Sequence, residues 1–118
     1  MKRDIDLVRK ILMSVEAKES PDDWLNIEIE GYSPVEISYH VKILAEAGYL
    51  DARDLSSTGN FEWAPVNLTW EGHEFLDAAR DTKIWNKAKG VISEKASSVS
   101  FEILKAVLLK IGMRTIGM

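Results

Sequence analysis

The centre of the chain reads SPVEISYHVKILAEAGYL over residues 33–50, which predicts a helix followed directly by a strand. Ser33 is a favoured N-cap, the proline after it suits the first helical position, and Glu36 stands where a capping box needs it. Gly48 is expected to end the helix, because glycine adopts the left-handed backbone of a helix C-terminus without steric cost. The strand then continues to Arg53.

The following segment predicts a hairpin and another helix. Residues 54–60 contain SSTGN, a composition typical of turns. Residues 61–68, FEWAPVNL, predict the returning strand, in which Pro65 must lie at an edge or a bulge because it has no N–H to donate. Thr69 can cap a helix that runs to about Arg80. We expect its buried stripe to be Trp70, Phe75, Leu76 and Ala79.

Further elements are expected on both sides of this segment. Residues 3–18 carry apolar side chains at the three-and-four spacing of a helix. Residues 24–30, WLNIEIE, alternate apolar and polar side chains, which predicts a strand. Residues 83–96 and 99–111 predict two more helices, with Gly112 ending the last one.

Two segments of the chain resemble bacterial winged-helix regulators. The first is ISYHVKILAEAGYL, residues 37–50, which is similar to their recognition helix and first wing strand, with a polar helix face before an L-x-x-A-G-x-L ending. The second is LTWEGHEFL, residues 68–76, which is similar to the L-T-x-x-G-x-x-F-L that leads from the wing into the next helix. Only residues 30–34 separate the first predicted strand from the recognition helix. The positioning helix of a full helix-turn-helix is therefore expected to be missing or merged.

The order of elements, with this resemblance, predicts a mostly α protein with a small antiparallel β-sheet, an α+β fold. Its winged-helix-like core is followed by C-terminal helices. We expect residues 1–82 to form the winged-helix-like domain. Residues 83–118 are expected to form a helical extension that packs on the same domain or on a dimer partner.

The whole chain also resembles a family of small bacterial and prophage-encoded proteins of unknown function. The similarity is carried by the opening MKRDIDLVRKIL and by GYS at residues 31–33, YHVK at 39–42 and LTWEGH at 68–73. The resemblance implies the same winged-helix-like core. It brings no activity, cofactor or catalytic residue with it.

The net charge of −4 conceals a strong asymmetry along the chain. Residues 20–82 carry thirteen acidic and three basic side chains, whereas residues 83–118 carry two acidic and seven basic ones. The basic end could hold phosphates, pair with the acidic part of a second copy, or complement the protein's own acidic surface. The chain has no cysteine and no apolar run near the ~20 residues of a membrane span, so we expect a cytoplasmic protein without membrane partners.

Residue patterns for catalysis or cofactor binding are absent from the sequence. The two histidines, His40 and His73, lack metal-ligand spacing, and paired carboxylates such as Asp22 and Asp23 are expected to be solvated. No glycine-rich phosphate loop and no G-x-S-x-G nucleophile motif occurs. We therefore expect no enzyme, no metal and no cofactor.

The predicted recognition helix and wing supply the candidate nucleic-acid contacts, which must lie near phosphates and base edges. These candidates are Ser38, Tyr39, His40, Lys42 and Arg53. Glu36 and Glu46 would oppose a phosphate backbone, and the wing tip carries no Lys or Arg. The leading hypothesis is a transcriptional regulator or phage accessory factor that binds double-stranded DNA. The alternative is an acidic winged-helix module that binds a basic protein partner and no DNA.

An apolar stripe on the last predicted helix is either a core face or the dimerisation surface of a homodimer. Its members are Phe101, Leu104, Val107, Leu108 and Ile111. The tryptophans are expected mainly as core anchors, and an exposed one would mark a partner surface. They are Trp24, Trp63, Trp70 and Trp85.

Overall fold

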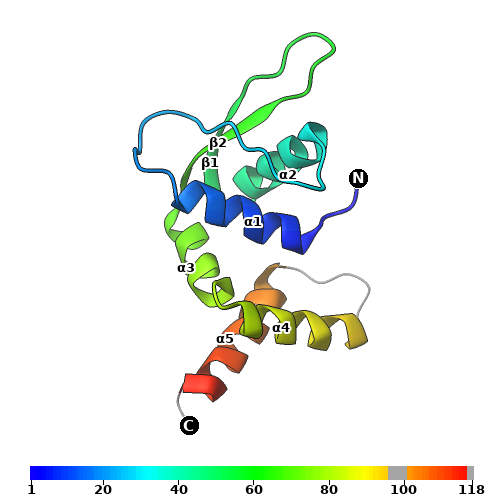
Figure 1. Ribbon diagram of the computed structural model, residues 1–118, viewed down its shortest axis with the longest axis vertical. Helices are drawn as coiled ribbons and strands as arrows, with labels where there is room; N and C mark the ends of the chain where they lie inside the picture. Colours follow the sequence, from blue (N-terminus) through cyan, green and yellow to red (C-terminus); the bar gives the residue numbers. More distant parts are fainter. Residues whose placement is uncertain (96–100, 117–118) are drawn as a thin grey trace. The chain divides into compact units, whose positions relative to one another are not determined.

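The computed structural model describes residues 1–95 and 101–116, and over these residues it confirms the predicted α+β class. The described part contains five helices and one two-stranded antiparallel sheet (Figure 1). In chain order the elements are α1 (Ile5–Glu16), α2 (Pro34–Glu46), β1 (Leu50–Asp54), β2 (Trp63–Leu68), α3 (Trp70–Ala79), α4 (Thr82–Lys95) and α5 (Phe101–Ile116).

The chain divides into two units, Met1–His73 and Glu74–Met118. The predicted organisation, a winged-helix-like domain over residues 1–82 followed by a helical extension over residues 83–118, stays a prediction. The boundary between the two compact units lies within α3. The first unit therefore holds α1, α2 and the β1–β2 hairpin, and the second holds α4 and α5, which pack against each other.

Helix α1 forms where the apolar spacing predicts it, two residues shorter at each end. Asp4 is its N-cap: the Oδ1 atom accepts hydrogen bonds from the backbone N–H groups of Asp6 (2.9 Å) and Leu7 (3.1 Å). These bonds satisfy two of the N–H groups that have no partner within a helix. The buried face consists of Leu7, Val8, Ile11, Leu12 and Val15.

The strand predicted over residues 24–30 is wrong, because this segment is extended but has no ladder partner. One backbone hydrogen bond, from Leu25 N to Pro65 O (2.8 Å), joins it to β2. Proline has no N–H to return that bond, and the N–H of Trp63, two residues back, already donates to the Ser38 hydroxyl. The predicted alternation is seen only in the burial of the side chains: Leu25, Ile27 and Ile29 are half-buried, and their neighbours in the sequence are exposed.

Residues 18–33 contain no helix, so no separate helix directly precedes α2, and the winged-helix-like plan with a missing or merged positioning helix stays a prediction. Helix α2 itself begins as predicted. Ser33 and Glu36 form the reciprocal capping box, with bonds of 3.1 Å from Glu36 N to Ser33 Oγ and 3.0 Å from Ser33 N to Glu36 Oε1. Gly48 adopts a φ of +88° just after the helix, which confirms its role at the C-terminus.

The two strands pair antiparallel with one irregularity next to Pro65, where the sequence predicts either an edge position or a bulge. Asp51 pairs with Asn67 but Ala52 pairs with Pro65, so Val66 has no partner in the ladder. Its carbonyl instead accepts a 2.8 Å hydrogen bond from the Lys18 ammonium. The bulge therefore interrupts the ladder at Val66, and the hairpin remains paired on both sides of it.

Helix α3 is capped by Thr69, whose Oγ1 accepts from Gly72 N at 3.1 Å. The buried stripe of α3 is confirmed for Phe75, Leu76 and Ala79. The prediction that Trp70 is buried is wrong: the residue is 77% exposed, because the first turn of α3 directs its side chain to solvent.

Helix α5 corrects the prediction that Gly112 is a stop, since it continues through that residue to Ile116. A glycine inside a helix costs only about 1 kcal/mol relative to alanine. A Cβ on Gly112 would lie 3.9 Å from Ile84 Cδ1, an ordinary van der Waals distance, so this side of the glycine faces α4.

Candidate functional site

Ser38, a predicted nucleic-acid contact, is buried beneath the hairpin and unavailable to a duplex. Only 7% of the residue is exposed. Its hydroxyl accepts a hydrogen bond from Trp63 N (3.1 Å) and lies 3.5 Å from Trp63 O, to which it donates. The expectation that Ser38 lies on the solvent face of α2 is wrong, because the hydroxyl occupies the place where the next strand of a sheet would bond.

His40, a second predicted contact, is buried as well, with 1% of the residue exposed. Its Nδ1 lies 2.8 Å from Glu36 O and its Nε2 accepts a 2.9 Å hydrogen bond from Asp4 N. These two partners require the neutral tautomer that carries its proton on Nδ1. His40 therefore joins α2 to the N-terminus of α1 and is a structural residue.

The spacing of residues along α2 predicts this burial. The positions Ile37, His40, Val41 and Leu44 follow the i, i+3, i+4, i+7 pattern of one helix face, and all four are buried. This periodicity indicates a buried position for His40, although histidine is polar.

Lys42, the cation of α2, is paired with carboxylates. Its Nζ lies 2.6 Å from Glu46 Oε2. That hydrogen bond is the main cause that raises the pKa of Lys42, with smaller contributions from the charges of Glu46, Tyr39 and Asp54. The pKa of Asp54 is lowered in turn, chiefly by hydrogen bonds from Ser56 and then by Lys42. The positive charge of α2 is thus offset where a phosphate would have to bind.

The two other predicted contacts are accessible. Arg53 is exposed on β1 between two exposed aspartates, Asp51 and Asp54. Tyr39 is half-buried, with its ring edge-on to His40 at 5.9 Å between centroids. The structure therefore leaves Tyr39, Lys42 and Arg53 at the surface and removes Ser38 and His40 from it.

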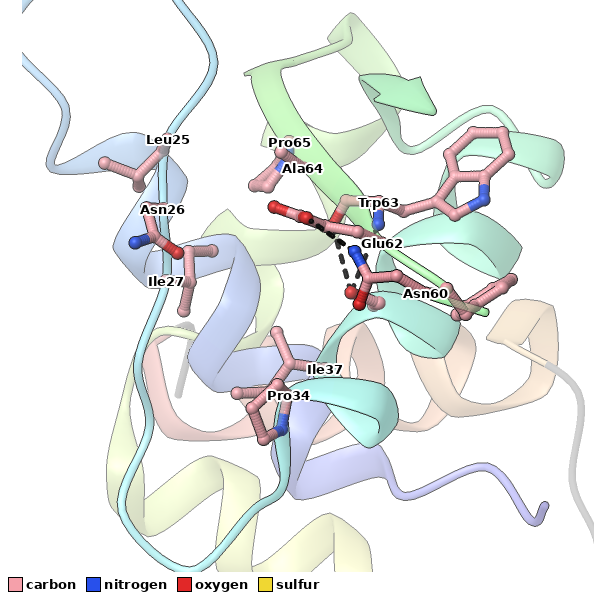
Figure 2. Close-up of a pocket in the computed structure, with 12 residues that line it drawn as sticks. Leu25, Asn26, Ile27, Pro34, Ile37, Asn60, Glu62, Trp63, Ala64 and Pro65 are labelled. Carbon is pink, nitrogen blue, oxygen red and sulfur yellow. Dashed lines mark hydrogen bonds between the residues drawn. The ribbon is translucent and has the colours of Figure 1, made fainter. Parts of the chain in front are cut away.

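A groove of about 240 Å³ lies beside the outer edge of β2. Residues 25–27 form one wall, residues 60–65 form the other, and Pro34 and Ile37 of α2 lie at one end (Figure 2). We refer to this space as the edge groove. The Leu25–Pro65 hydrogen bond joins its two walls.

The walls of the edge groove combine aliphatic surface with one carboxylate. Figure 2 shows the Glu62 carboxylate extending towards residues 25–27, while the ring of Trp63 points away. Glu62 Oε1 accepts a 3.3 Å hydrogen bond from the Asn60 amide. Within the described ranges no ion pair involves Glu62.

Exposed apolar side chains flank the edge groove. Phe61 lines it and is 39% exposed. Trp24 precedes Leu25 and is 43% exposed, and Val35 follows Pro34 and is exposed too. The predicted core role of the tryptophans holds for Trp85, which is 2% exposed, and is wrong for Trp24 and Trp70.

The predicted dimerisation stripe lies mostly in the interior of the second unit. Leu104, Leu108 and Ile111 are buried and Val107 is half-buried, whereas the side chain of Phe101 lies outside the described part. Because α4 packs against α5, a second copy could reach these side chains only if the two helices separated. Dimerisation through this stripe stays a prediction.

Within residues 1–95 and 101–116 the structure offers neither a metal-binding cluster nor a membrane-spanning helix. No three His, Asp or Glu side chains there lie close enough together to hold a metal ion. None of the described helices has the length and apolar character to cross a membrane.

The chain is similar to proteins that have been grouped without an assigned activity. Residues 2–98 match a family model described as "Hypothetical protein (DUF2513)". A Haemophilus influenzae protein described as "Uncharacterized protein" is 37% identical over 108 residues, which cover 91% of this chain and 92% of the relative. No solved structure matches. The predicted resemblance to a family of unknown function is thereby confirmed, while a prophage origin stays a prediction.

Proposed function

The chain belongs to the DUF2513 family of hypothetical proteins, and from its geometry we propose that it is a protein-binding module of the winged-helix type that does not grip duplex DNA. The module acts by binding and carries out no reaction. Its contact surface is the edge groove with its flanking apolar side chains. DNA binding, the leading hypothesis from the sequence, becomes the competing outcome of the test.

The observation that carries this proposal is the burial of Ser38 and His40. A recognition helix reads DNA with side chains that reach base edges and phosphates from its solvent face. In α2 two of the four polar candidates instead hold the first unit together. Lys42 forms an ion pair with Glu46, which leaves Arg53 as the remaining cation of the predicted contact set.

Charge supports the same conclusion. Binding to duplex DNA takes most of its affinity from cations placed near phosphates. Residues 20–82 hold thirteen acidic and three basic side chains, so the field around α2 and the hairpin opposes a polyanion. A basic protein surface is attracted by the same field.

The apolar side chains beside the edge groove favour a protein partner. Interfaces between proteins are enriched in aromatic residues that bury their rings on binding. Trp24 and Phe61 are each about two-fifths exposed; Phe61 lines the edge groove, and Trp24 directly precedes Leu25, which lines it too. A partner that covered them would gain about 25 cal/mol for each Å² of apolar area removed from water.

Fluorescence anisotropy with a labelled random duplex separates the two functions. We expect no saturable binding at low ionic strength, of about 50 mM. Micromolar binding that falls by about a thousandfold on raising the salt to about 200 mM, as six phosphate contacts would produce, contradicts the proposal. Loss of that binding in Arg53→Ala would place the duplex on the hairpin.

The protein-binding half is tested by affinity purification from nuclease-treated extract, followed by calorimetry with the purified partner. Phe61→Ser and Trp24→Ser should each weaken the reconstituted complex at least tenfold, a loss typical of an interface hot spot. Trp70→Ser is the matched control, because Trp70 is also exposed but neither lines the edge groove nor adjoins in sequence a residue that does. Equal losses in all three variants, or none in the first two, contradict the proposed surface.

A further inference from the structure

We infer that the edge groove receives a lysine or arginine side chain from a partner segment, with Glu62 as its counter-ion. This inference rests on the proposed protein-binding function and specifies its ligand. It is carried by the size of the groove, the chemistry of its walls and the charge around it.

The volume of the edge groove indicates the class of ligand that it can receive. Pockets for small molecules usually measure about 300–1,000 Å³, and the edge groove measures about 240 Å³. A single long side chain suits that volume better than a nucleotide or a drug-sized compound. The ligand is therefore one residue of a chain that continues outside the groove.

The backbone of β2 does not bind that segment as an added strand. Groups on the outer edge of β2 are already bonded: Pro65 O accepts from Leu25 N, and Trp63 N donates to Ser38 Oγ, which in turn donates to Trp63 O. A peptide that added a strand would have to displace both partners. Recognition by an inserted side chain leaves these bonds in place.

The walls match the two parts of a cationic side chain. Ile27, Ile37 and Pro34 offer aliphatic surface to a methylene stem (Figure 2). Glu62 and Asn60 offer oxygen acceptors to the charged head at the other wall. Lysine and arginine bury their stems in this way while the head remains at a polar rim.

Charge complementarity selects a cation over a neutral side chain of the same length. A carboxylate has about four acceptor sites, and Glu62 uses one of them for the Asn60 amide at 3.3 Å. Glu28 and Glu30 follow the wall residues 25–27 and are exposed, so they add to the negative field around the groove without lining it. A cation placed between these walls gains charge-assisted hydrogen bonds that a neutral group cannot make as strongly.

The test uses two seven-residue peptides, acetyl-Gly-Ser-Val-Arg-Val-Ser-Gly-amide and the same peptide with citrulline for arginine. Citrulline keeps the length and the stem but is uncharged. Titrated into ¹⁵N-labelled full-length protein, the arginine peptide should shift the amide signals of residues 25–27 and 60–64. The citrulline peptide should bind about five- to tenfold more weakly, the difference expected for one charge-assisted hydrogen bond.

Glu62→Gln should lower the affinity for the arginine peptide to that of citrulline and leave the citrulline peptide unaffected. Glu28→Gln is the matched control, since it removes the same charge nearby without lining the groove, and should change either affinity less than twofold. Equal binding of the two peptides, equal effects of both variants, or no shifts up to about 5 mM peptide would each overturn the inference.

Two further outcomes separate this inference from the proposed function. The first is a purified partner that binds the wild-type protein and Glu62→Gln with equal affinity but does not bind Phe61→Ser. In that case the protein-binding function stands and the cation inference is wrong. If the same amide signals shift with protein concentration alone, a second copy occupies the groove. In that case the basic residues of the second unit are the ligand, and the inference of a separate partner is overturned.

Discussion

At the scale of single residues, the hydrogen-bond partners of His40 explain why a polar residue is buried in α2. The ring fills a core position and satisfies Asp4 N, a group at the start of α1 that would otherwise be unpaired. Leaving a buried donor without a partner costs about 1–3 kcal/mol, and removing a large buried side chain adds the cost of a cavity.

We predict that His40→Ala lowers the free energy of unfolding by about 2–4 kcal/mol, measured by urea denaturation with linear extrapolation. His73→Ala is the control, because that side chain is exposed, and should change stability by less than about 0.5 kcal/mol. Similar small effects for both histidines would show that His40 is not part of the core.

Tyr32 is a second residue that ties the segment before α2 to α1. Its hydroxyl donates to Asp4 Oδ2 at 3.1 Å, and the Lys10 ammonium lies 5.6 Å from the centre of its ring. Burial is the main cause that raises the pKa of Tyr32 above 10.0, followed by the hydrogen bond to Asp4 and the charges of Asp4, Asp6 and Glu36.

A raised pKa in the folded state gives a defined pH dependence. The neutral phenol contributes stability that is fully present below the unfolded pKa of 10.0 and is lost as the pH rises through the folded value. We predict that the free energy of unfolding falls more steeply above pH 10 in wild-type protein than in Tyr32→Phe. Parallel curves for the two proteins over that range would refute the coupling.

At the scale of secondary structure, Pro65 in β2 explains why residues 24–30 do not pair with β2 as a third strand. The alternation at residues 24–30 satisfies every local criterion for a strand. A strand also needs a partner that donates and accepts in register, and Pro65 can only accept. The Ser38 hydroxyl completes the cover of this edge, which protects it against pairing with another chain.

We predict that Ser38→Ala destabilises the fold by about 1–3 kcal/mol, because Trp63 N loses its acceptor in a partly buried site. Ser14→Ala is the control, since the Ser14 hydroxyl only bonds back to Lys10 O on the exposed side of α1. Hydrogen exchange of the Trp63 amide should quicken in the first variant and remain unchanged in the second. Unchanged exchange in Ser38→Ala would mean that another group protects this edge.

At the scale of the whole molecule, the start of α3 is held against the junction of α2 and β1. Thr69 donates from its hydroxyl to Gly48 O at 2.6 Å and from its backbone N–H to Tyr49 O at 3.2 Å. Gly72 brings the first turn of α3 onto the same carbonyl: a Cβ at this position would lie 1.9 Å from Tyr49 O. Only glycine allows that approach without movement of the backbone.

We predict that Gly72→Ala lowers the thermal midpoint and costs about 1–3 kcal/mol or more, since an overpacked contact with backbone cannot relax by a rotamer change. Gly90→Ala in α4 is the matched control. A Cβ there meets nothing within 4 Å, so alanine should stabilise the helix by about 0.5–1 kcal/mol. Equal effects at the two glycines would contradict the close approach.

Much of this architecture could be predicted from local patterns. Rules that act within one turn or one hairpin predict the N-cap at Ser33, the end of α2 at Gly48 and the irregularity at Pro65. They also predict the apolar faces of α1 and, apart from Trp70, of α3. The edge groove could not be predicted. Its walls come from residues 25–27 and 60–65, and no local signal marks Asn60 or Glu62 as neighbours of that earlier segment.

The sequence alone determined the order of the elements, the α+β class and the acidic character of the first unit, because periodicity, caps and charge are properties of neighbouring residues. Tertiary structure decided which polar side chains remain available for binding. Ser38 and His40 are buried because their hydrogen-bond partners, Trp63 and Asp4, lie 25 and 36 residues away. Burial depends on what packs against a face, and that is settled only when distant segments meet.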